Sequence, residues 1–173
     1  MTTLLPISPK RARHVLPDLR FILRHPAHFL AFGFGTGLSP FAPGTVGTLV
    51  GFPLYFLLRG LDPAVYFFVV ALLYVAGIWF CDVAGKAIGV ADHGGIVWDE
   101  IVAFLLILPF APFTLTGFAA AFLLFRLFDI WKPFPIRYAD RHIHGGFGVM
   151  FDDLLAACYA IACLLAMTHW KLW

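Results

Sequence analysis

The sequence has 173 residues, of which 61% are hydrophobic and only 13% are charged. A water-soluble protein usually carries about 25% charged residues, so much of this surface is expected to face something other than water. One integral membrane domain over residues 1–173 is the best interpretation. The net charge of +2 is too small to indicate a nucleic-acid partner, and three cysteines without CxxC spacing predict neither a disulfide framework nor a zinc site.

The chain begins with a basic segment, residues 1–32, that mixes basic, histidine and apolar side chains. Its residues 10–31 are predicted to form an interfacial amphipathic helix, interrupted at Pro17 and Pro26. A Gly/Pro-rich loop, residues 33–48, follows and contains the sequence SPFAPGTVGT.

Five apolar runs are predicted to be membrane-embedded helices, so the expected fold class is an all-α integral membrane protein. These runs are residues 46–58, 63–81, 101–113, 115–128 and 154–170. A short turn joins the first run to the second, and another joins the third to the fourth. These turns predict two helical hairpins, followed by a single C-terminal helix. Several runs are shorter than the roughly 20 residues that cross a bilayer upright. The sequence leaves open whether 46–58 and 101–113 span the membrane or re-enter it.

Charge is distributed very unevenly along this predicted topology. Ten of the twelve Lys and Arg residues fall in the N-terminal segment and the two long polar loops, and only Arg59 and Lys171 lie on the other side. The positive-inside rule places the N-terminus and both polar loops in the cytoplasm. All acidic residues except Asp62 share that side, so the chemistry is expected at the cytoplasmic face.

Two acidic pairs mark candidate metal ligands. Asp99 and Glu100 in ADHGGIVWDE, and Asp152 and Asp153 in GGFGVMFDDLLAAC, are each predicted to open an apolar helix. Helix capping is the simpler explanation for one such pair, but capping needs only one residue. Two pairs on the same side of the membrane predict two walls of one metal site. Oxygen ligands without cysteine favour Mg²⁺ over zinc.

The segment FRLFDIWKPFPIRYADRHIHGG adds further charged candidates. Asp129 is predicted in the last turn of a helix, where it could pair with Arg126 or bind the metal. Beyond the prolines, a short loop is predicted to carry basic residues that bind either phosphate or anionic lipid headgroups. The loop SPFAPGTVGT is a weaker phosphate-site candidate, in which Thr45 or Thr48 could instead cap a helix.

Together these residues predict an enzyme that acts on a phospholipid headgroup. The signatures of cysteine-dependent, aspartyl-phosphate and histidine phosphatases and of phospholipase D are missing from the sequence. Water activated by a metal is the remaining simple nucleophile. The proposed phosphate-binding residues are Lys132, Arg137, Arg141, Thr45 and Thr48. Asp140 or His93 is the candidate proton carrier, and Lys132 is the third candidate catalytic group.

Four ordered motifs, SPFAPGTVGT, DHGGIVWDE, FRLFDIWKPFPI and GGFGVMFDD, resemble the bacterial phosphatidylglycerophosphatase A family from about Gly33 to Ala157. The resemblance implies Mg²⁺-dependent removal of the terminal phosphate from phosphatidylglycerophosphate at the bacterial inner membrane. The site would then hold one or two Mg²⁺ ions on Asp99, Glu100, Asp129, Asp152 and Asp153.

Two other classes of function are alternatives to the enzyme. A small transporter or ion-binding membrane protein would be expected to carry carboxylates in the middle of its apolar runs, whereas here they lie at the cytoplasmic ends. A noncatalytic lipid-binding scaffold would retain its function after substitution of the acidic pairs. The oligomeric state is not predicted.

Overall fold

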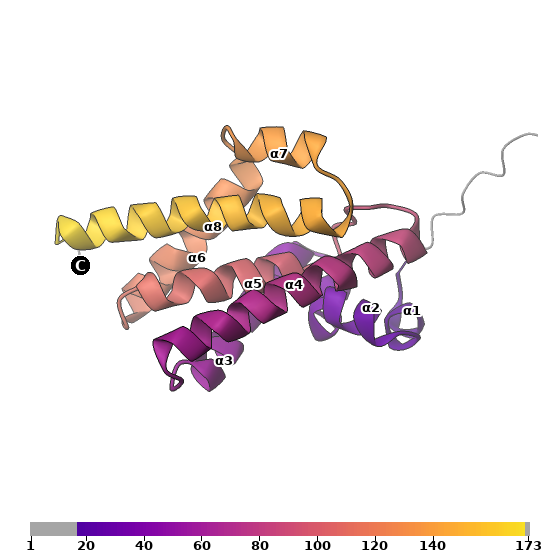
Figure 1. The fold of residues 1–173 in the computed structure, drawn as a ribbon, viewed down its shortest axis with the longest axis horizontal. Helices are drawn as coiled ribbons and strands as arrows, with labels where there is room; N and C mark the ends of the chain where they lie inside the picture. The colour runs from indigo at the N-terminus through magenta and orange to yellow at the C-terminus, as the bar shows by residue number, and fades with distance from the viewer. Residues whose placement is uncertain (1–16, 172–173) are drawn as a thin grey trace, which may run out of the picture.

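The structure is a computed structural model that describes residues 17–171, and every element in that range is helical (Figure 1). The elements in chain order are α1 (Leu19–Leu23), α2 (Pro26–Ala31), the 3₁₀ helix η1 (Gly33–Leu38), α3 (Pro43–Leu58), α4 (Pro63–Ile88), α5 (Trp98–Ile107), the 3₁₀ helix η2 (Leu108–Phe110), α6 (Leu115–Trp131), α7 (Ile136–His142) and α8 (Gly145–His169). The all-α prediction is confirmed.

The N-terminal segment forms two short helices in its described part. The Asp18 carboxylate caps α1 by accepting from the Phe21 N–H at 2.7 Å, and α2 begins at Pro26 as the predicted interruption requires. Ile22 and Phe32 are fully buried, so these helices pack into the protein instead of lying wholly on its surface. Residues 1–16, which include much of the predicted basic segment, lie outside the described residues.

Two predictions about the C-terminal part of the chain were wrong. Helix α8 begins at Gly145, nine residues before the predicted 154, so Asp152 and Asp153 lie inside the helix instead of opening it. A helix, α7, forms where a loop was predicted. The stretch GGFG resembles a loop because glycine disfavours helices. Here the small residues allow close packing, since a Cβ on Gly146 would overlap the Ile78 carbonyl oxygen of α4.

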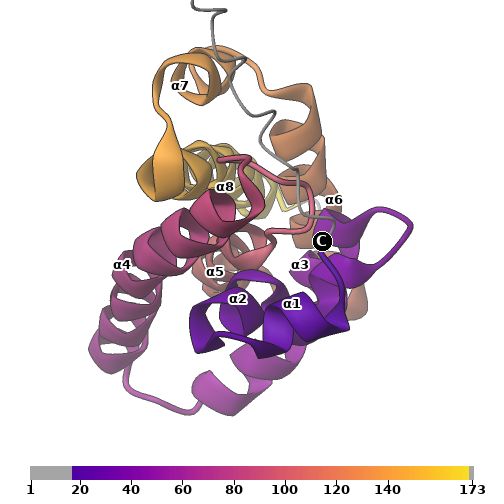
Figure 2. The ribbon, with the colours of Figure 1, turned by 90° about the vertical axis from the view of Figure 1, so that its right-hand side faces the viewer.

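The helices pack in an order that differs from their order in the chain. Helix α8 packs on α4, α5, α6 and α7, while α3 packs mainly on α5. Viewed along the bundle, α5 lies between α3, α4 and α8 (Figure 2). The consecutive pairs α3–α4 and α5–α6 contact each other much less, so the predicted two-hairpin arrangement is not confirmed.

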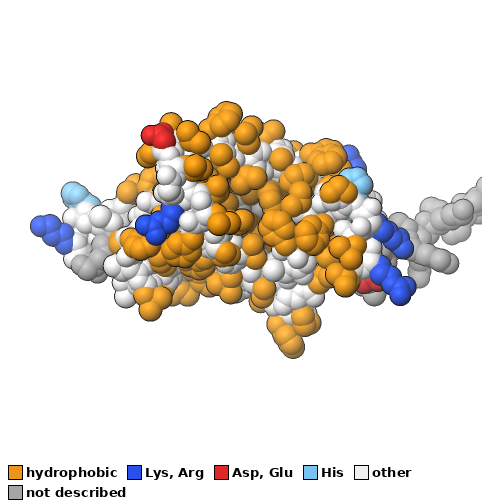
Figure 3. Space-filling view, turned by 90° about the horizontal axis from the view of Figure 1, so that it is seen from below, with side chains coloured by type: hydrophobic (Ala, Val, Ile, Leu, Met, Phe, Trp, Pro, Cys, Tyr) orange, Lys and Arg blue, Asp and Glu red, His pale blue; other side chains and the backbone are white. Residues whose placement is uncertain are grey.

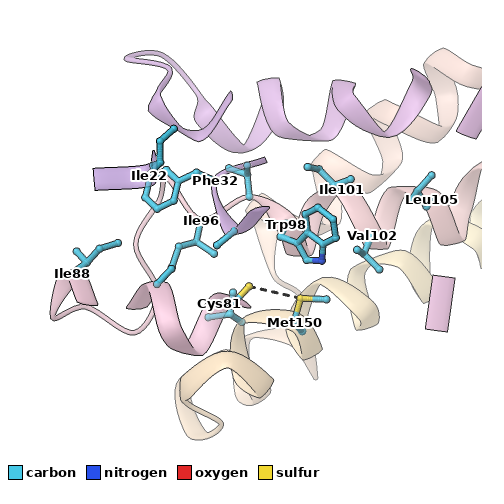
Figure 4. Close-up of a cluster of buried hydrophobic side chains, with 14 of the residues drawn as sticks. Ile22, Phe32, Cys81, Ile88, Ile96, Trp98, Ile101, Val102, Leu105 and Met150 are labelled. Atoms are coloured by element: carbon cyan, nitrogen blue, oxygen red, sulfur yellow. Dashed lines mark hydrogen bonds between the residues drawn. The ribbon is translucent and has the colours of Figure 1, made fainter. Parts of the chain in front are cut away.

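A buried apolar cluster fixes the position of α5 against its neighbours (Figure 4). The Trp98 indole N–H donates to the Leu73 carbonyl of α4 at 3.1 Å, and the Tyr66 hydroxyl donates to the Leu105 carbonyl at 2.7 Å. Each bond satisfies a polar group at an otherwise apolar helix contact. The first turn of α5, which carries Asp99 and Glu100, is therefore held in place from the α4 side.

Two helices, α4 and α8, are long and apolar enough to cross a membrane, with 26 and 25 residues. At 1.5 Å per residue each is roughly 38 Å long, which exceeds the hydrocarbon thickness of about 30 Å. Helix α3 is apolar but shorter, with 16 residues. The surface in Figure 3 is largely apolar, with most charged side chains gathered toward its two ends. Five membrane-embedded segments remain a prediction.

Candidate active site

The first acidic pair lies in the first turn of α5. The N-cap residue is Val97, which makes no side-chain capping bond, so neither Asp99 nor Glu100 is the N-cap residue. The Val97 N–H donates to the Ala31 carbonyl at 2.9 Å, which ties the start of α5 to the end of α2. Just before it, Gly95 packs so closely on η1 that a Cβ on Gly37 would overlap the Gly95 carbonyl oxygen.

The second acidic pair lies on the second and third turns of α8, and its two members point to different partners. Asp153 is 2% exposed and contributes to a group with Asp99 and Glu100, in which one carboxylate oxygen from each residue lies within 4.8 Å of the others. Asp152 instead accepts a hydrogen bond from the Lys132 ammonium at 2.5 Å. We call Asp99, Glu100 and Asp153 the carboxylate triad.

Each member of the carboxylate triad has a buried oxygen that no hydrogen-bond donor among the described residues satisfies. These atoms are Asp99 Oδ1, Glu100 Oε2 and Asp153 Oδ2. Buried carboxylates this close repel one another, and leaving a charged acceptor unpaired costs at least about 1–3 kcal/mol. A bound cation would satisfy all three oxygens at once.

Arg126 and Asp129 of α6 form the next wall of the site. The Arg126 guanidinium lies 2.6 Å from the Asp129 carboxylate and 3.4 Å from the Glu100 carboxylate. The pairing of Arg126 with Asp129 expected from their spacing is therefore present, and Arg126 is also shared with the carboxylate triad. Arg126 Nε has no hydrogen-bond partner among the described residues, which leaves this buried cation a free donor.

Lys132 connects three helices at the end of α6. It adopts a left-handed backbone conformation with φ of 47°, which is uncommon for a residue with a side chain. Its ammonium donates to Asp140 of α7 at 2.6 Å and to Asp152 of α8 at 2.5 Å. Burial alone would lower the pKa of Lys132, but these two bonds outweigh it and raise its pKa, so Lys132 stays cationic at neutral pH.

These groups line one cavity of about 330 Å³, which we call the carboxylate cavity. Its lining includes all five predicted metal ligands and both cations: Asp99, Glu100, Asp129, Asp152, Asp153, Arg126 and Lys132. Carboxylates beside cations in one cavity can bind a metal and a phosphate group together.

Comparison with known proteins identifies the family of the chain. The family model for Phosphatidylglycerophosphatase A matches residues 29–168. The chain belongs to the phosphatidylglycerophosphatase A family.

Named relatives come from three bacteria. The phosphatidylglycerophosphatase A of Escherichia coli strain K12 is 42% identical over 88% of this chain and 90% of its own length. The phosphatidylglycerophosphatase A of Haemophilus influenzae strain Rd is 44% identical over 90% of this chain and 97% of its own length. A Bacteroides thetaiotaomicron protein named as a candidate phosphatidylinositol-3-phosphatase is 38% identical over 80% of this chain and 90% of its own length. No solved structure matches the chain significantly. Membership of this family makes the protein a phosphatase.

The predicted basic residues do not all lie at the carboxylate cavity of this family member. Arg137 and Arg141 line a separate surface hollow of about 430 Å³ on α7, which Lys132 also borders. The Arg137 guanidinium donates to the Trp131 carbonyl at 3.0 Å. This position, among exposed aromatic side chains, fits the alternative of anionic headgroup contact as well as phosphate binding.

The two candidate proton carriers are placed differently. Asp140 lies at Lys132 and lines a small hollow together with Asp92 and Asp152. His93 is outside the lining of the carboxylate cavity, and its Nδ1 accepts from the Gly95 N–H at 3.0 Å. Asp140 is also outside this lining, but its bond to Lys132, which lines the cavity, favours Asp140 over His93.

The Gly/Pro-rich loop reaches the site through its backbone. Helix α3 starts at Pro43 with Ala42 as N-cap, so neither threonine caps it, and the buried Thr48 hydroxyl donates to the Gly44 carbonyl at 2.8 Å. Among the described residues, none forms a hydrogen bond with the Thr45 side chain. Gly44 packs directly on Glu100, because a Cβ there would overlap Glu100 Oε1. The residue of this loop that reaches the site is thus Gly44 and not the predicted threonines, and its only signal in the sequence is its place in the PGT turn.

Proposed function

We propose that this chain hydrolyses the terminal phosphate monoester of phosphatidylglycerophosphate, with Mg²⁺, to give phosphatidylglycerol and inorganic phosphate. Two relatives that align over about nine-tenths of the chain carry the name of this activity. The third relative is named for a different lipid headgroup, which supports a phosphate monoester on a lipid as the shared chemistry. The observation that carries the proposal is the carboxylate triad with its three unpartnered buried oxygens.

The residues of the site fit a divalent cation. The donors are all carboxylate oxygens, which suit Mg²⁺, and no thiol is among them. Asp99, Glu100 and Asp153 would hold the ion, and Asp129 lies on the same cavity wall. When bound, Mg²⁺ would polarise the phosphoryl oxygens and lower the pKa of water at the site.

Arg126 and Lys132 supply the positive charge that a phosphate group needs. Arg126 is held against Glu100 and Asp129, and Lys132 is held by Asp140 and Asp152, so both cations are fixed before substrate arrives. Fixed cations stabilise developing charge without reorganising at the moment of reaction. Their role is to bind and orient the phosphoryl oxygens facing the carboxylate triad.

Hydrolysis breaks the bond between phosphorus and the glycerol oxygen and forms a bond between phosphorus and a water oxygen. The leaving glycerol oxygen takes up one proton, and the attacking water gives one up. Asp140 is the proposed proton carrier because it lies next to Lys132 at the edge of the site.

The site would lie at the cytoplasmic surface of the bacterial inner membrane. Helices α4 and α8 are the candidate spans. The carboxylate cavity is lined by Asp152 and Asp153 near the start of α8 and by Asp92, which follows the end of α4. The transporter alternative is not favoured, because the acidic residues gather at this one end instead of following a path across the bilayer.

Phosphate release from phosphatidylglycerophosphate in detergent micelles tests the proposal. Purified protein should release phosphate with Mg²⁺ and stop when EDTA is added. Asp99→Asn should abolish release, while Asp62→Asn should not, because Asp62 lies at the opposite end of α4 and asparagine retains its capping of that helix. No release by the wild type, or equal rates in EDTA, would refute the proposal.

A further inference from the structure

We propose that an apolar groove beside the carboxylate triad holds one acyl chain of the lipid substrate. The inference rests on the proposed function. The groove has a volume of about 350 Å³ and lies between α4, α5 and α8. Its walls are almost entirely apolar, from Phe67, Val70, Ala71, Tyr74, Val75, Val102, Ala103, Leu106, Met150 and Leu154, and Asp99 completes them.

The groove is continuous with the site of chemistry. Asp99 lines both the groove and the carboxylate cavity, so a single residue separates the apolar walls from the proposed metal. An amphipathic ligand whose phosphate lies at the carboxylate triad would place its next atoms at the mouth of this groove. Among the ligands that could fill an apolar groove, the acyl chain of the same lipid is covalently attached to the headgroup and therefore lies near the groove whenever the phosphate is at the carboxylate triad.

The groove also has the direction and length of an acyl chain. Helix α5 leaves the site end of the molecule at Trp98, and α8 leaves it at Gly145, so groove residues later in both helices lie deeper in the bundle. From Val75 to Phe67 the groove follows eight residues of α4, which is roughly 12 Å at 1.5 Å per residue. One leaflet of the hydrocarbon core is about 15 Å thick. The groove therefore matches most of one leaflet.

Besides Asp99 Oδ1, a second polar atom of the groove-lining residues has no hydrogen-bond partner among the described residues. The Tyr74 hydroxyl is buried, and no described residue forms a hydrogen bond with it. Burying a hydroxyl without a partner is unfavourable, so such groups in folded proteins usually mark a bound water or ligand. The ester carbonyl that joins an acyl chain to glycerol is an acceptor that lies between the phosphate and the chain. Tyr74 is assigned as the donor to that carbonyl.

Side-chain size sets the width of the groove. Ala71 of α4 and Ala103 of α5 are small residues in its walls, and Ala71 is exposed, so a larger side chain there would fill the groove without disturbing the core. The matched control is Ala119, an exposed alanine on α6 that lines none of the cavities described above.

The test compares dioleoyl phosphatidylglycerophosphate with the same headgroup after removal of both acyl chains. Ala71→Phe is expected to lower kcat/KM on the dioleoyl lipid about tenfold, because the phenyl ring would occupy part of the groove. A change of one methylene in an apolar pocket already alters kcat/KM by about this factor. Its kcat/KM on the deacylated headgroup should stay within about twofold, and Ala119→Phe should match the wild type on both. Tyr74→Phe should raise KM for the dioleoyl lipid about threefold to tenfold and leave the deacylated headgroup unaffected.

Equal losses on both substrates, or no loss on either, would overturn the groove proposal. Native mass spectrometry of the same proteins with dioleoyl phosphatidylglycerol provides a readout that does not depend on catalysis. Wild type and Ala119→Phe should retain bound lipid, and Ala71→Phe should lose it. A wild type that retains lipid but releases no phosphate would refute the proposed function and support the groove, whereas equal retention by Ala71→Phe would refute the groove.

Discussion

The two acidic pairs look alike in the sequence and differ in the structure. Both members of the Asp99–Glu100 pair belong to the carboxylate triad, whereas only Asp153 of the second pair does, and Asp152 holds Lys132 instead. Neighbouring residues on a helix point about 100° apart, so a doubled carboxylate on α8 serves two partners on different sides. A doubled acid can thus supply one candidate metal ligand and one group that fixes a cation.

The largest expected effect on activity is that of Asp153→Asn, which should exceed the effect of Asp152→Asn in the same acidic pair. Asp153→Asn should lower kcat for phosphate release by about 10²–10³, the size expected when one preorganised electrostatic group is removed from a reacting centre. The measurement is phosphate release at the Mg²⁺ concentration that saturates the wild type. Loss of folding is excluded by a thermal melt in EDTA, in which Asp153→Asn should melt no lower than the wild type because it removes like-charge repulsion within the carboxylate triad. A kcat close to that of the wild type would contradict the role given to Asp153.

Asp152→Asn should have a smaller effect of a different kind. It leaves the carboxylate triad intact but weakens the anchoring of Lys132, so a loss of about 10–100-fold is expected, as for residues that orient a site without contacting the reacting atoms. The loss should appear mainly in KM, and Lys132→Met should resemble it. Equal kinetic defects in Asp152→Asn and Asp153→Asn would contradict the distinction between the two residues.

The sequence predicts the fold class and the acidic residues of the site but not the partner of each acid. Long apolar runs correctly predicted an all-helical protein, and residue type predicted five carboxylate ligands that the structure gathers in one cavity. The sequence could not show which neighbour each acid faces, because that depends on where α8 begins. The stretch GGFG concealed that start, since glycine is a poor helix former but lets α8 approach α4 closely.

The sequence also did not predict which helices pack against each other. Short turns suggested that consecutive helices pair, but α3 packs mainly on α5 and α4 packs on α8. Apolar faces of similar composition do not specify their partners, and the small residues that decide close approach are visible only once the helices are assembled. Arg126, known from its spacing only as a partner of Asp129, turned out to contact Glu100 as well.

The first turn of α3 offers a sharper test of the first acidic pair. Gly44→Ala places a methyl group against Glu100 Oε1 and near Arg126, so it should shift Glu100 and lower kcat/KM about tenfold. Gly60→Ala is the matched control, because a methyl group there meets no atom within 4 Å. Normal activity in Gly44→Ala would show that Glu100 need not keep its position.

The smallest effect is expected on α7. Arg141→Ala should change kcat/KM by no more than about threefold in neutral detergent, because Arg141 lines the exposed hollow and not the carboxylate cavity. In vesicles that contain anionic lipid the loss should be larger, since a juxtamembrane basic residue contributes about 1 kcal/mol to surface binding. A large loss in neutral detergent would instead place Arg141 in contact with the reacting phosphate.

The central claim, that the carboxylate triad holds Mg²⁺, is tested most directly by calorimetric titration of Mg²⁺ into purified protein freed of metal with EDTA. Wild type and Asp62→Asn should bind Mg²⁺ with the same affinity and stoichiometry, and Asp153→Asn should show no binding in the same range. Undiminished binding by Asp153→Asn would contradict the account.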